Sequence, residues 1–369
     1  MAHELTIRAN GAAEMAYLGD VPWHGLGQPM QAGASIEDWI KAAGMDWTIR
    51  RALVRYFADE DTRADCFELC EAPGETVLFR SDTRAHLGIV SPDYQIVQPR
   101  QVLEFFRDMV ESNGAHLETA GTLFGGRRFW GLAKFAAESV HGAADVVGGY
   151  LLLCTSADGT MATEARETTV RVVCNNTLRM ARGADGGAVA PVRISHAARF
   201  DDKSIKAKLS AAPGNFAAAM ETARRLASVR VSEAAAAQFV RDLLRPAEAA
   251  EREAAQKKAA EAAAAAGATG PDAAFAAILA RIKSTDAAAE AKRRAPRGEA
   301  AILELFRGGA MGSALPGVAG SAWGLLNAVT EYVDHAATAK STDHRLSSAW
   351  FGDGDKLKER ALVAALELV

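Results

Sequence analysis

The chain has 369 residues, of which 49% are hydrophobic and 24% charged, a balance typical of a folded globular protein rather than a disordered or fibrous one. Its formal net charge is −4 and its pI is about 6.1, so the chain as a whole has no general attraction for nucleic acid. The charge is unevenly distributed, because the window from Arg166 to Lys208 holds nine Lys or Arg against four Asp or Glu, a local charge of +5. A local basic surface is therefore compatible with the acidic average.

Cysteine content and hydropathy indicate the compartment. Four cysteines are sparse for this length and do not suggest a disulfide framework, so we expect them to be reduced; they are Cys66, Cys70, Cys154 and Cys174. The N-terminus lacks the basic-then-apolar layout of a signal peptide, and no run of 18 apolar residues occurs. We therefore expect a cytoplasmic protein with no membrane partner.

The first half of the chain predicts a meander of strands between two helices. Residues 1–34 are rich in Gly and Pro and predict an ordered loop, and a helix follows in which Ser35 and Asp38 form a capping box and Gly44 ends the helix. Strand-like sequence then dominates, and Pro73-Gly74 predicts a hairpin turn between two of its four segments, which are residues 47–57, 66–69, 76–80 and 86–90. A second helix is expected to begin at Pro99 and to end at Asn113-Gly114.

The second half of the core is expected to hold three longer strands, over residues 126–135, 150–155 and 160–174, with a tight hairpin at Asp158-Gly159. Asn175 and Asn176 can cap a short helix over residues 177–182, and a last strand follows near residues 191–195. Beyond residue 200 the pattern is helical. The Ala-rich tract from residue 246 to 296 has too little apolar bulk for a core of its own, whereas residues 321–336 form an amphipathic helix with Trp323 on its apolar stripe.

These patterns predict an α+β fold, in which an antiparallel β-rich sheet packs against helices and is followed by a helical C-terminal part. We divide the chain into an N-terminal loop segment (1–34), an α+β core (35–200), a helical connection (201–245), an Ala-rich charged helical arm or insert (246–297) and a C-terminal helical segment (298–369).

Several short strings carry a resemblance to a known family. They are Pro22-Trp23-His24-Gly25-Leu26-Gly27, Tyr94-Gln95-Ile96-Val97-Gln98, Arg171-Val172-Val173-Cys174-Asn175-Asn176-Thr177-Leu178, Ala322-Trp323-Gly324, Asn327-Ala328-Val329-Thr330-Glu331-Tyr332-Val333-Asp334-His335 and Phe351-Gly352. In this order the strings resemble the phage- and plasmid-related proteins built on domain of unknown function 932, over nearly the whole chain. The tract from residue 246 to 296 departs from that pattern, being longer and richer in Ala.

The resemblance implies a setting on mobile elements, where proteins that bind and anneal single-stranded DNA are frequent. Rad52-like annealing proteins share a β-rich sheet with a packed helix, and the expected core is similar to them in outline, at the level of the fold alone. The sequence has no Gly-Lys-Ser phosphate loop, no Gly-x-Gly-x-x-Gly after a strand and no Gly-x-Ser-x-Gly elbow. We therefore expect no cofactor, and NTP-driven or hydrolytic chemistry is disfavoured.

Basic and aromatic residues alternate in one short segment, where Arg127, Arg128, Phe129 and Trp130 follow Phe124 and two glycines. Arg neutralises phosphate and aromatic rings stack on bases, so this segment has the composition of a single-strand platform. Four further arginines could extend the platform, namely Arg166, Arg171, Arg179 and Arg182. The alternative is a hairpin whose rings enter the core and whose arginines are solvated, because neighbours in a strand point to opposite faces.

The leading hypothesis is a mobile-element protein that binds single-stranded DNA or other single-stranded nucleic acid, with homo-oligomerisation and strand annealing left open. One alternative is a metal-dependent enzyme acting on nucleic acid, with ligands from Asp158 and Glu164 or from Glu331, Asp334 and His335. Another is a protein-interaction or structural protein that uses the helical arm as its contact surface. We assign no catalytic and no metal-ligating residue, because Asp158 is already expected in a turn and Glu331 and His335, at i and i+4, lack a third ligand of known position.

Overall fold

The computed structural model describes residues 6–8, 10–19, 22, 25–58, 68–112, 114–142, 144–171, 176–178, 191–245, 254 and 298–369. The chain divides into two compact units, one of residues 1–222 with 338–350 and one of residues 223–337 with 351–369, and each unit is described by itself. Apart from residue 254, the Ala-rich tract that we predicted to be a helical arm lies outside the described residues. So do Trp23 and His24 of the N-terminal segment.

The first unit is built on an eight-stranded sheet in the order β10-β9-β8-β7-β6-β1-β2, with β11 also pairing with β9. Its pairs are antiparallel except for β1 with β2, which is parallel. The strands are β1 (Met15–Tyr17), β2 (Gln28–Pro29), β6 (His116–Leu123), β7 (Arg128–Ser139), β8 (Val146–Ser156), β9 (Thr163–Arg171), β10 (Asn176–Leu178) and β11 (Val192–Ile194). The N-terminal segment that we predicted to be a loop thus contributes β1 and β2 to the sheet.

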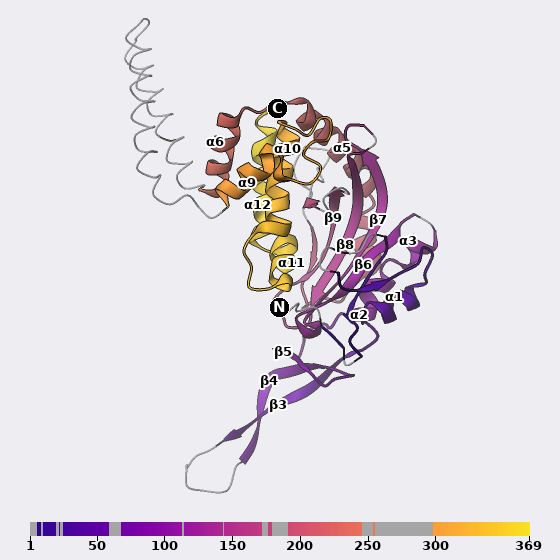
Figure 1. Cartoon of the computed structure of the whole chain (residues 1–369). Coiled ribbons are helices and arrows are strands. Elements are labelled where there is room, and N and C mark those ends of the chain that lie inside the picture. The colour runs from indigo at the N-terminus through magenta and orange to yellow at the C-terminus, as the bar shows by residue number, and fades with distance from the viewer. Residues whose placement is uncertain are drawn as a thin grey trace, which may run out of the picture. The chain divides into compact units, whose positions relative to one another are not determined.

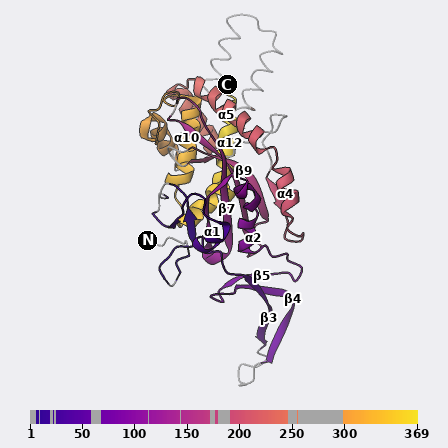
Figure 2. The same ribbon diagram turned by 90° about the vertical axis from the view of Figure 1, so that its right-hand side faces the viewer.

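Helices cover both faces of this sheet (Figures 1 and 2). On one face lie α1 (Ile36–Ala42), α2 (Pro99–Glu104) and α3 (Arg107–Glu111), and the opposite face of β7 meets α11 (Thr342–Phe351). Neighbours in β7 show the alternation directly: a Cβ on Gly131 would lie 2.8 Å from the Phe106 ring, whereas the Trp130 ring meets Trp350 edge-on. Every residue of β8 after Val146 is buried, as expected for a strand covered on both sides.

Two of the helices on this sheet begin as their sequences predict. Ser35 accepts a hydrogen bond from the Asp38 N–H, and the Asp38 carboxylate accepts one from the Ser35 N–H, which is the expected capping box of α1. Pro99 occupies the first turn of α2. The unit continues through α4 (Asp202–Lys208) into α5 (Ala212–Ser228), whose last residues belong to the second unit. The predicted α+β fold class is confirmed.

A smaller antiparallel sheet in the order β3-β4-β5 also belongs to the first unit, and Figure 1 shows β3 and β4 projecting from the larger sheet as a ribbon. Its strands are β3 (Ile49–Ala58), β4 (Glu68–Arg80) and β5 (His86–Val90). The hairpin predicted at Pro73-Gly74 is wrong, because the sequence on both sides of this dipeptide pairs with the same strand, β3. Residues 72–75 instead form a bulge in β4 opposite Val54, and Gly74 has the positive φ of 90° that this bulge uses.

The helix predicted over residues 177–182 is also wrong for the two of these residues that the structure describes, Thr177 and Leu178. Asn176, Thr177 and Leu178 form β10, whose backbone pairs antiparallel with Thr169 to Arg171 of β9. Pairing with a neighbouring strand overrides the capping tendency of Asn, a preference that local sequence alone suggests. Asn175 and residues 179–190 lie outside the described residues.

The second unit is helical and is centred on α10 (Ala322–Glu331), every residue of which is buried. The predicted apolar stripe is confirmed, since Trp323 is 2% exposed and Leu326, Val329 and Val333 are also buried. Around α10 lie the end of α5, α6 (Glu233–Leu244), α9 (Glu299–Glu304), η3 (Leu305–Gly309), η4 (Tyr332–Ala336) and α12 (Asp353–Leu366). Among the helices that the structure describes, none has an apolar stretch long enough to cross a membrane.

Candidate nucleic-acid interface

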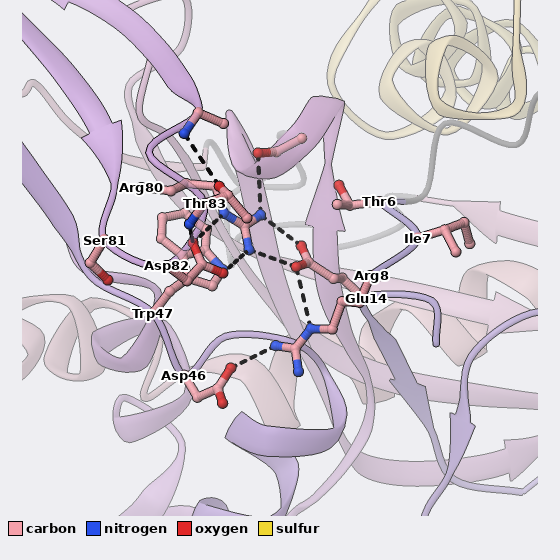
Figure 3. Close-up of a pocket in the computed structure, with 12 residues that line it drawn as sticks. Thr6, Ile7, Arg8, Glu14, Asp46, Trp47, Arg80, Ser81, Asp82 and Thr83 are labelled. Atoms are coloured by element: carbon pink, nitrogen blue, oxygen red, sulfur yellow. Dashed lines mark hydrogen bonds and ion pairs between the residues drawn. The ribbon is translucent and has the colours of Figure 1, made fainter. Parts of the chain in front are cut away.

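A pocket of about 560 Å³ lies in the first unit, where the N-terminal segment, the β4–β5 turn and the turn before β7 meet (Figure 3). This volume is within the range of small-molecule sites. Its lining includes Thr6, Ile7, Arg8, Glu14, Asp46, Trp47, Arg80, Ser81, Asp82, Thr83, Ala85 and Gly125. The pocket therefore borders the segment in which the sequence places its arginine and aromatic residues.

A buried ion pair between Arg80 and Glu14 forms the inner wall of the pocket (Figure 3). Two N–H groups of Arg80 donate to the two Glu14 carboxylate oxygens at 2.6 and 2.9 Å, and two donate to Asp82 at 2.8 and 3.0 Å. A further contact runs from Arg80 Nη1 to the Gly125 carbonyl oxygen at 3.3 Å. Thr122 completes the shell by donating its hydroxyl to Glu14 at 2.6 Å.

The protonation states of this network follow from the contacts. Burial alone would lower the pKa of Arg80, but its hydrogen bonds with Glu14 and Asp82 outweigh that effect and raise it. The hydrogen bonds that Arg80 donates in turn hold the pKa of Asp82 below its usual value, against the opposing effect of partial burial. Arg80 and Asp82 are therefore charged at neutral pH.

The pocket itself is poorly suited to a phosphate group. It contains two arginines, Arg8 and Arg80, against three carboxylates, and the Arg80 N–H groups are already directed at protein acceptors. Arg8 is likewise engaged, by Asp46 at 2.6 Å and more weakly by Glu14 at 3.4 Å. We infer that the network is structural and that it fixes the neighbouring turn by holding the Gly125 carbonyl.

That turn, residues 124–128, has unusual backbone geometry. Phe124, Gly125 and Gly126 have consecutive positive φ angles of 55°, 72° and 93°. For glycine this costs little, but for a bulky residue such as Phe it is strained, and such strain persists where the surroundings enforce it. Gly126 is required by space as well, since a Cβ there would lie 2.7 Å from the Trp47 ring that packs under Arg80.

The turn presents a half-buried Phe124 ring together with two arginines. The Arg128 guanidinium carbon lies 5.3 Å from the centre of the Phe124 ring, and the His344 ring of α11 approaches the same ring edge-on at 5.3 Å. Arg128 also donates to Ser347 of α11 and, at 3.3 Å, to Thr160. The backbone of Arg127 is fixed because its carbonyl accepts from the Ala157 N–H at 2.7 Å, while its side chain is exposed and has no ion pair in the described part of the chain.

The two rings that the sequence favoured for stacking are buried. Phe129 is 1% exposed and contacts Trp47, and Trp130 is 2% exposed and contacts Trp350. Successive strand residues point to opposite faces, and in this sheet both faces are covered, so both rings enter the core. The expectation that Phe129 or Trp130 provides a stacking surface is therefore corrected, and the accessible ring of this segment is Phe124.

The more distant arginines do not gather at this turn in the described structure. Arg166 is 5% exposed and lies 3.5 Å from Glu164, a carboxylate that also accepts from Arg193 at 2.9 Å. The side chain of Arg171 and all of Arg179 and Arg182 lie outside the described residues. Of the predicted set, Arg127 and Arg128 are the two that the structure places together at the surface.

The carboxylates considered as metal ligands have protein partners. Glu331 accepts from the Met311 N–H at 3.1 Å, Asp334 pairs with the buried Lys358 at 2.8 Å, and Asp158 accepts from the Thr160 hydroxyl at 2.6 Å. Within the described ranges, no group of three or more His, Cys, Asp or Glu side chains is arranged to hold a metal ion. The metal-dependent enzyme stays a prediction without a site in these ranges.

Sequence reasoning missed the contribution of α11, whose His344, Ser347 and Trp350 contact the segment from Phe124 to Trp130. No local pattern could have indicated it, because more than two hundred residues separate the partners, as in the pair Arg128 and Ser347 with a separation of 219. The positive φ at Phe124 has a weak signal in the two glycines that follow it, which are typical of a left-handed turn.

Comparison with known proteins adds a family but no activity. A family model described as a domain of unknown function (DUF932) matches residues 86–350, a range that includes both the Phe124 turn and α11. Neither the curated proteins nor the solved structures include a match to this chain.

Proposed function

The chain belongs to the family of domain of unknown function 932, and we propose that it binds single-stranded nucleic acid through the Phe124 turn and α11. The Phe124 turn is defined as residues 124–128. In this proposal Arg127 and Arg128 contact phosphates, and the Phe124 ring stacks on an unpaired base.

The strained conformation of Phe124 is the observation that carries the proposal. A phenylalanine at a φ of 55° is uncommon, and here the buried Arg80 network holds the adjoining Gly125 carbonyl while Gly126 packs on Trp47. The result is an aromatic ring presented at the surface beside an exposed arginine. Strain that is maintained by a rigid support is a recurring property of binding sites.

The local charge is consistent with a phosphate backbone. The segment 338–350, whose His344 meets the Phe124 ring, carries Lys340 and Arg345 against Asp343. Lys340 is exposed and Arg345 half-buried. The turn offers one accessible ring, and because every base has a face that can stack on it, we expect binding with little sequence preference.

We place this activity on mobile elements, in phage or plasmid DNA metabolism, with strand annealing as its extension. Support comes from the motifs by which the sequence resembles phage- and plasmid-related proteins. Annealing also requires that a bound strand keep its bases accessible, which a single stacking ring and phosphate contacts allow.

The test is a fluorescence anisotropy titration of single-stranded DNA, duplex DNA and single-stranded RNA across a salt series. Arg127→Ala should weaken binding to all single-stranded sequences alike and reduce the salt slope by about 0.7. Its matched control is Arg360→Ala, which removes another exposed arginine, from α12 in the second unit.

Phe124→Asn separates stacking from charge, because Asn accepts the left-handed conformation and preserves the turn. We expect a loss of roughly 1–3 kcal/mol in binding, about 5- to 150-fold, with an unchanged salt slope. Absence of binding to any nucleic acid at low salt would refute the function. Equal effects of Arg127→Ala and Arg360→Ala would show that the Phe124 turn is not the contact surface.

A further inference from the structure

The outer edge of β3 is open over most of its length. Among the described strands β3 pairs with β4 alone, so its other edge is left without a neighbouring strand. At Ile49 the Gln98 side chain covers this edge, accepting from the Ile49 N–H at 2.7 Å and donating to the Ile49 carbonyl at 3.1 Å. In the described part of the chain no such cover exists for the outward backbone groups of Leu53 and Arg55.

The same ribbon exposes large apolar side chains. Leu53, Phe57 and Leu69 are 60%, 69% and 51% exposed and share one face by strand alternation, while Tyr56 on the other face is 53% exposed. Ile89, which is 51% exposed on β5, lies on the same face as Tyr56 but two strands away from the open edge. Leu53, Tyr56 and Phe57 all belong to β3, so a strand paired at its open edge would lie beside them.

An unpaired edge with exposed apolar side chains is the kind of surface that recruits another strand. Beyond the bulge the ribbon has two strands only, and an isolated two-stranded hairpin is marginally stable in water. A partner that adds strands would satisfy the backbone groups and cover the apolar side chains together.

We propose that the partner is a second copy of this chain, whose β3 pairs antiparallel with β3 about a two-fold axis at Val54. Two three-stranded sheets would then join into a continuous six-stranded sheet. Because the Ile49 N–H and carbonyl point outward, toward Gln98, the outward groups along β3 belong to the odd-numbered residues. Pairing therefore joins odd residues to odd residues, and the axis must pass through a residue rather than between two.

Charge favours Val54 over the two neighbouring axes, at Leu53 and at residue 55. With Val54 there, Arg51, whose guanidinium donates to the Pro92 and Tyr94 carbonyls of its own chain, is opposite the partner's Phe57, and Leu53 is opposite the partner's Arg55, so no like charges meet. An axis at Leu53 would place Arg51 opposite Arg55, and an axis at residue 55 would place the two copies of Arg55 opposite each other. Both of these registers are disfavoured by repulsion.

The first test is the mass of the full chain in solution, by light scattering and sedimentation equilibrium, where we expect about twice 39.0 kDa. Leu53 is exposed, so Leu53→Lys and Leu53→Glu should fold equally well and serve as matched variants. The two-fold axis creates two pairs of residue 53 with the partner's Arg55. In both pairs Lys would repel the arginine and Glu would attract it, so the dissociation constant for Leu53→Lys should exceed that for Leu53→Glu by about tenfold or more. A monomer at all concentrations overturns the proposal, and so does an equal effect of the two substitutions.

Cysteine cross-linking tests the register itself, in a background with Cys66→Ser and Cys70→Ser. On the axis, Val54→Cys would face its own copy across a non-hydrogen-bonded pair at about 4.5 Å between Cα atoms, within disulfide range. Ala52→Cys on the same face would lie about 13 Å along the strand from its own copy, and it should remain reduced. Cross-linking of Ala52→Cys in preference to Val54→Cys would refute the axis. The dimer does not depend on nucleic-acid binding, so the two proposals stand or fall separately.

Discussion

Replacing Arg80 by Met should destabilise the first unit strongly, because it removes one partner of a buried ion pair. Arg80 and Glu14 are 2% and 1% exposed, and the substitution deletes both hydrogen bonds from Arg80 to Glu14, both to Asp82 and the one to Gly125. Glu14 would keep the Thr122 hydroxyl and the 3.4 Å contact with Arg8, but its charge would remain buried without its main counter-ion. Such losses typically cost about 3–5 kcal/mol of unfolding free energy.

Urea unfolding followed by far-UV circular dichroism and tryptophan fluorescence measures this cost, and Trp47, 4.2 Å from the Arg80 guanidinium, provides a local signal. Arg307→Met is the matched control, since its ion pair with Glu233 is more than half exposed on both sides and should contribute less than about 1 kcal/mol. The double variant Glu14→Leu with Arg80→Met should recover part of the loss, because no isolated charge remains buried. A cost for Arg80→Met as small as that of the control would refute the structural role assigned to the network.

Three further predictions concern stability. Gly126→Ala should lower the free energy of unfolding by roughly 1–3 kcal/mol, measured by urea unfolding, because the added Cβ would lie 2.7 Å from Trp47 at a φ of 93°; an unchanged midpoint would contradict it. Trp323→Ala should cost roughly 3–5 kcal/mol in the same assay, since the ring is 2% exposed, and a loss below 1 kcal/mol would exclude tight packing. Burial raises the pKa of Glu167, against a smaller lowering by the Asn215 hydrogen bond, so its charged form destabilises the fold as pH rises through that pKa. Glu167→Gln should therefore raise the melting temperature at neutral pH. A gain that persists below about pH 4, where the wild-type carboxyl is protonated, would refute this cause.

Sequence patterns correctly predicted the features that are set by residues close together in the chain. The Ser35–Asp38 capping box and the buried stripe on α10 are of this kind, because spacing along one helix sets them. Pro73-Gly74 and Asn176 were misread because their conformations depend on which strand lies beside them. A dipeptide typical of a hairpin becomes a bulge when the strands on both sides of it face the same partner.

Only part of the candidate site could be predicted from the sequence, because the rest depends on residues that are distant in the chain. Arg127 and Arg128 were identified from composition, and they do lie together at the surface or near it. Phe129 and Trp130 have the same composition signal, but their burial depends on Trp47 and on α11, which no local pattern connects to them. Glu14 and Arg80 are 66 residues apart, and their pairing likewise became visible only with the fold.

The return of residues 338–350 to the first unit has a consequence for synthesis of the protein. Trp130 is translated 220 residues before its partner Trp350, and Phe124 is likewise translated 220 residues before His344. A nascent chain on the ribosome therefore carries β7 without the Trp350 and His344 rings while those 220 residues are synthesised. Premature termination anywhere before α11 would yield a product that has the arginines of the Phe124 turn but lacks the helix against which they are held.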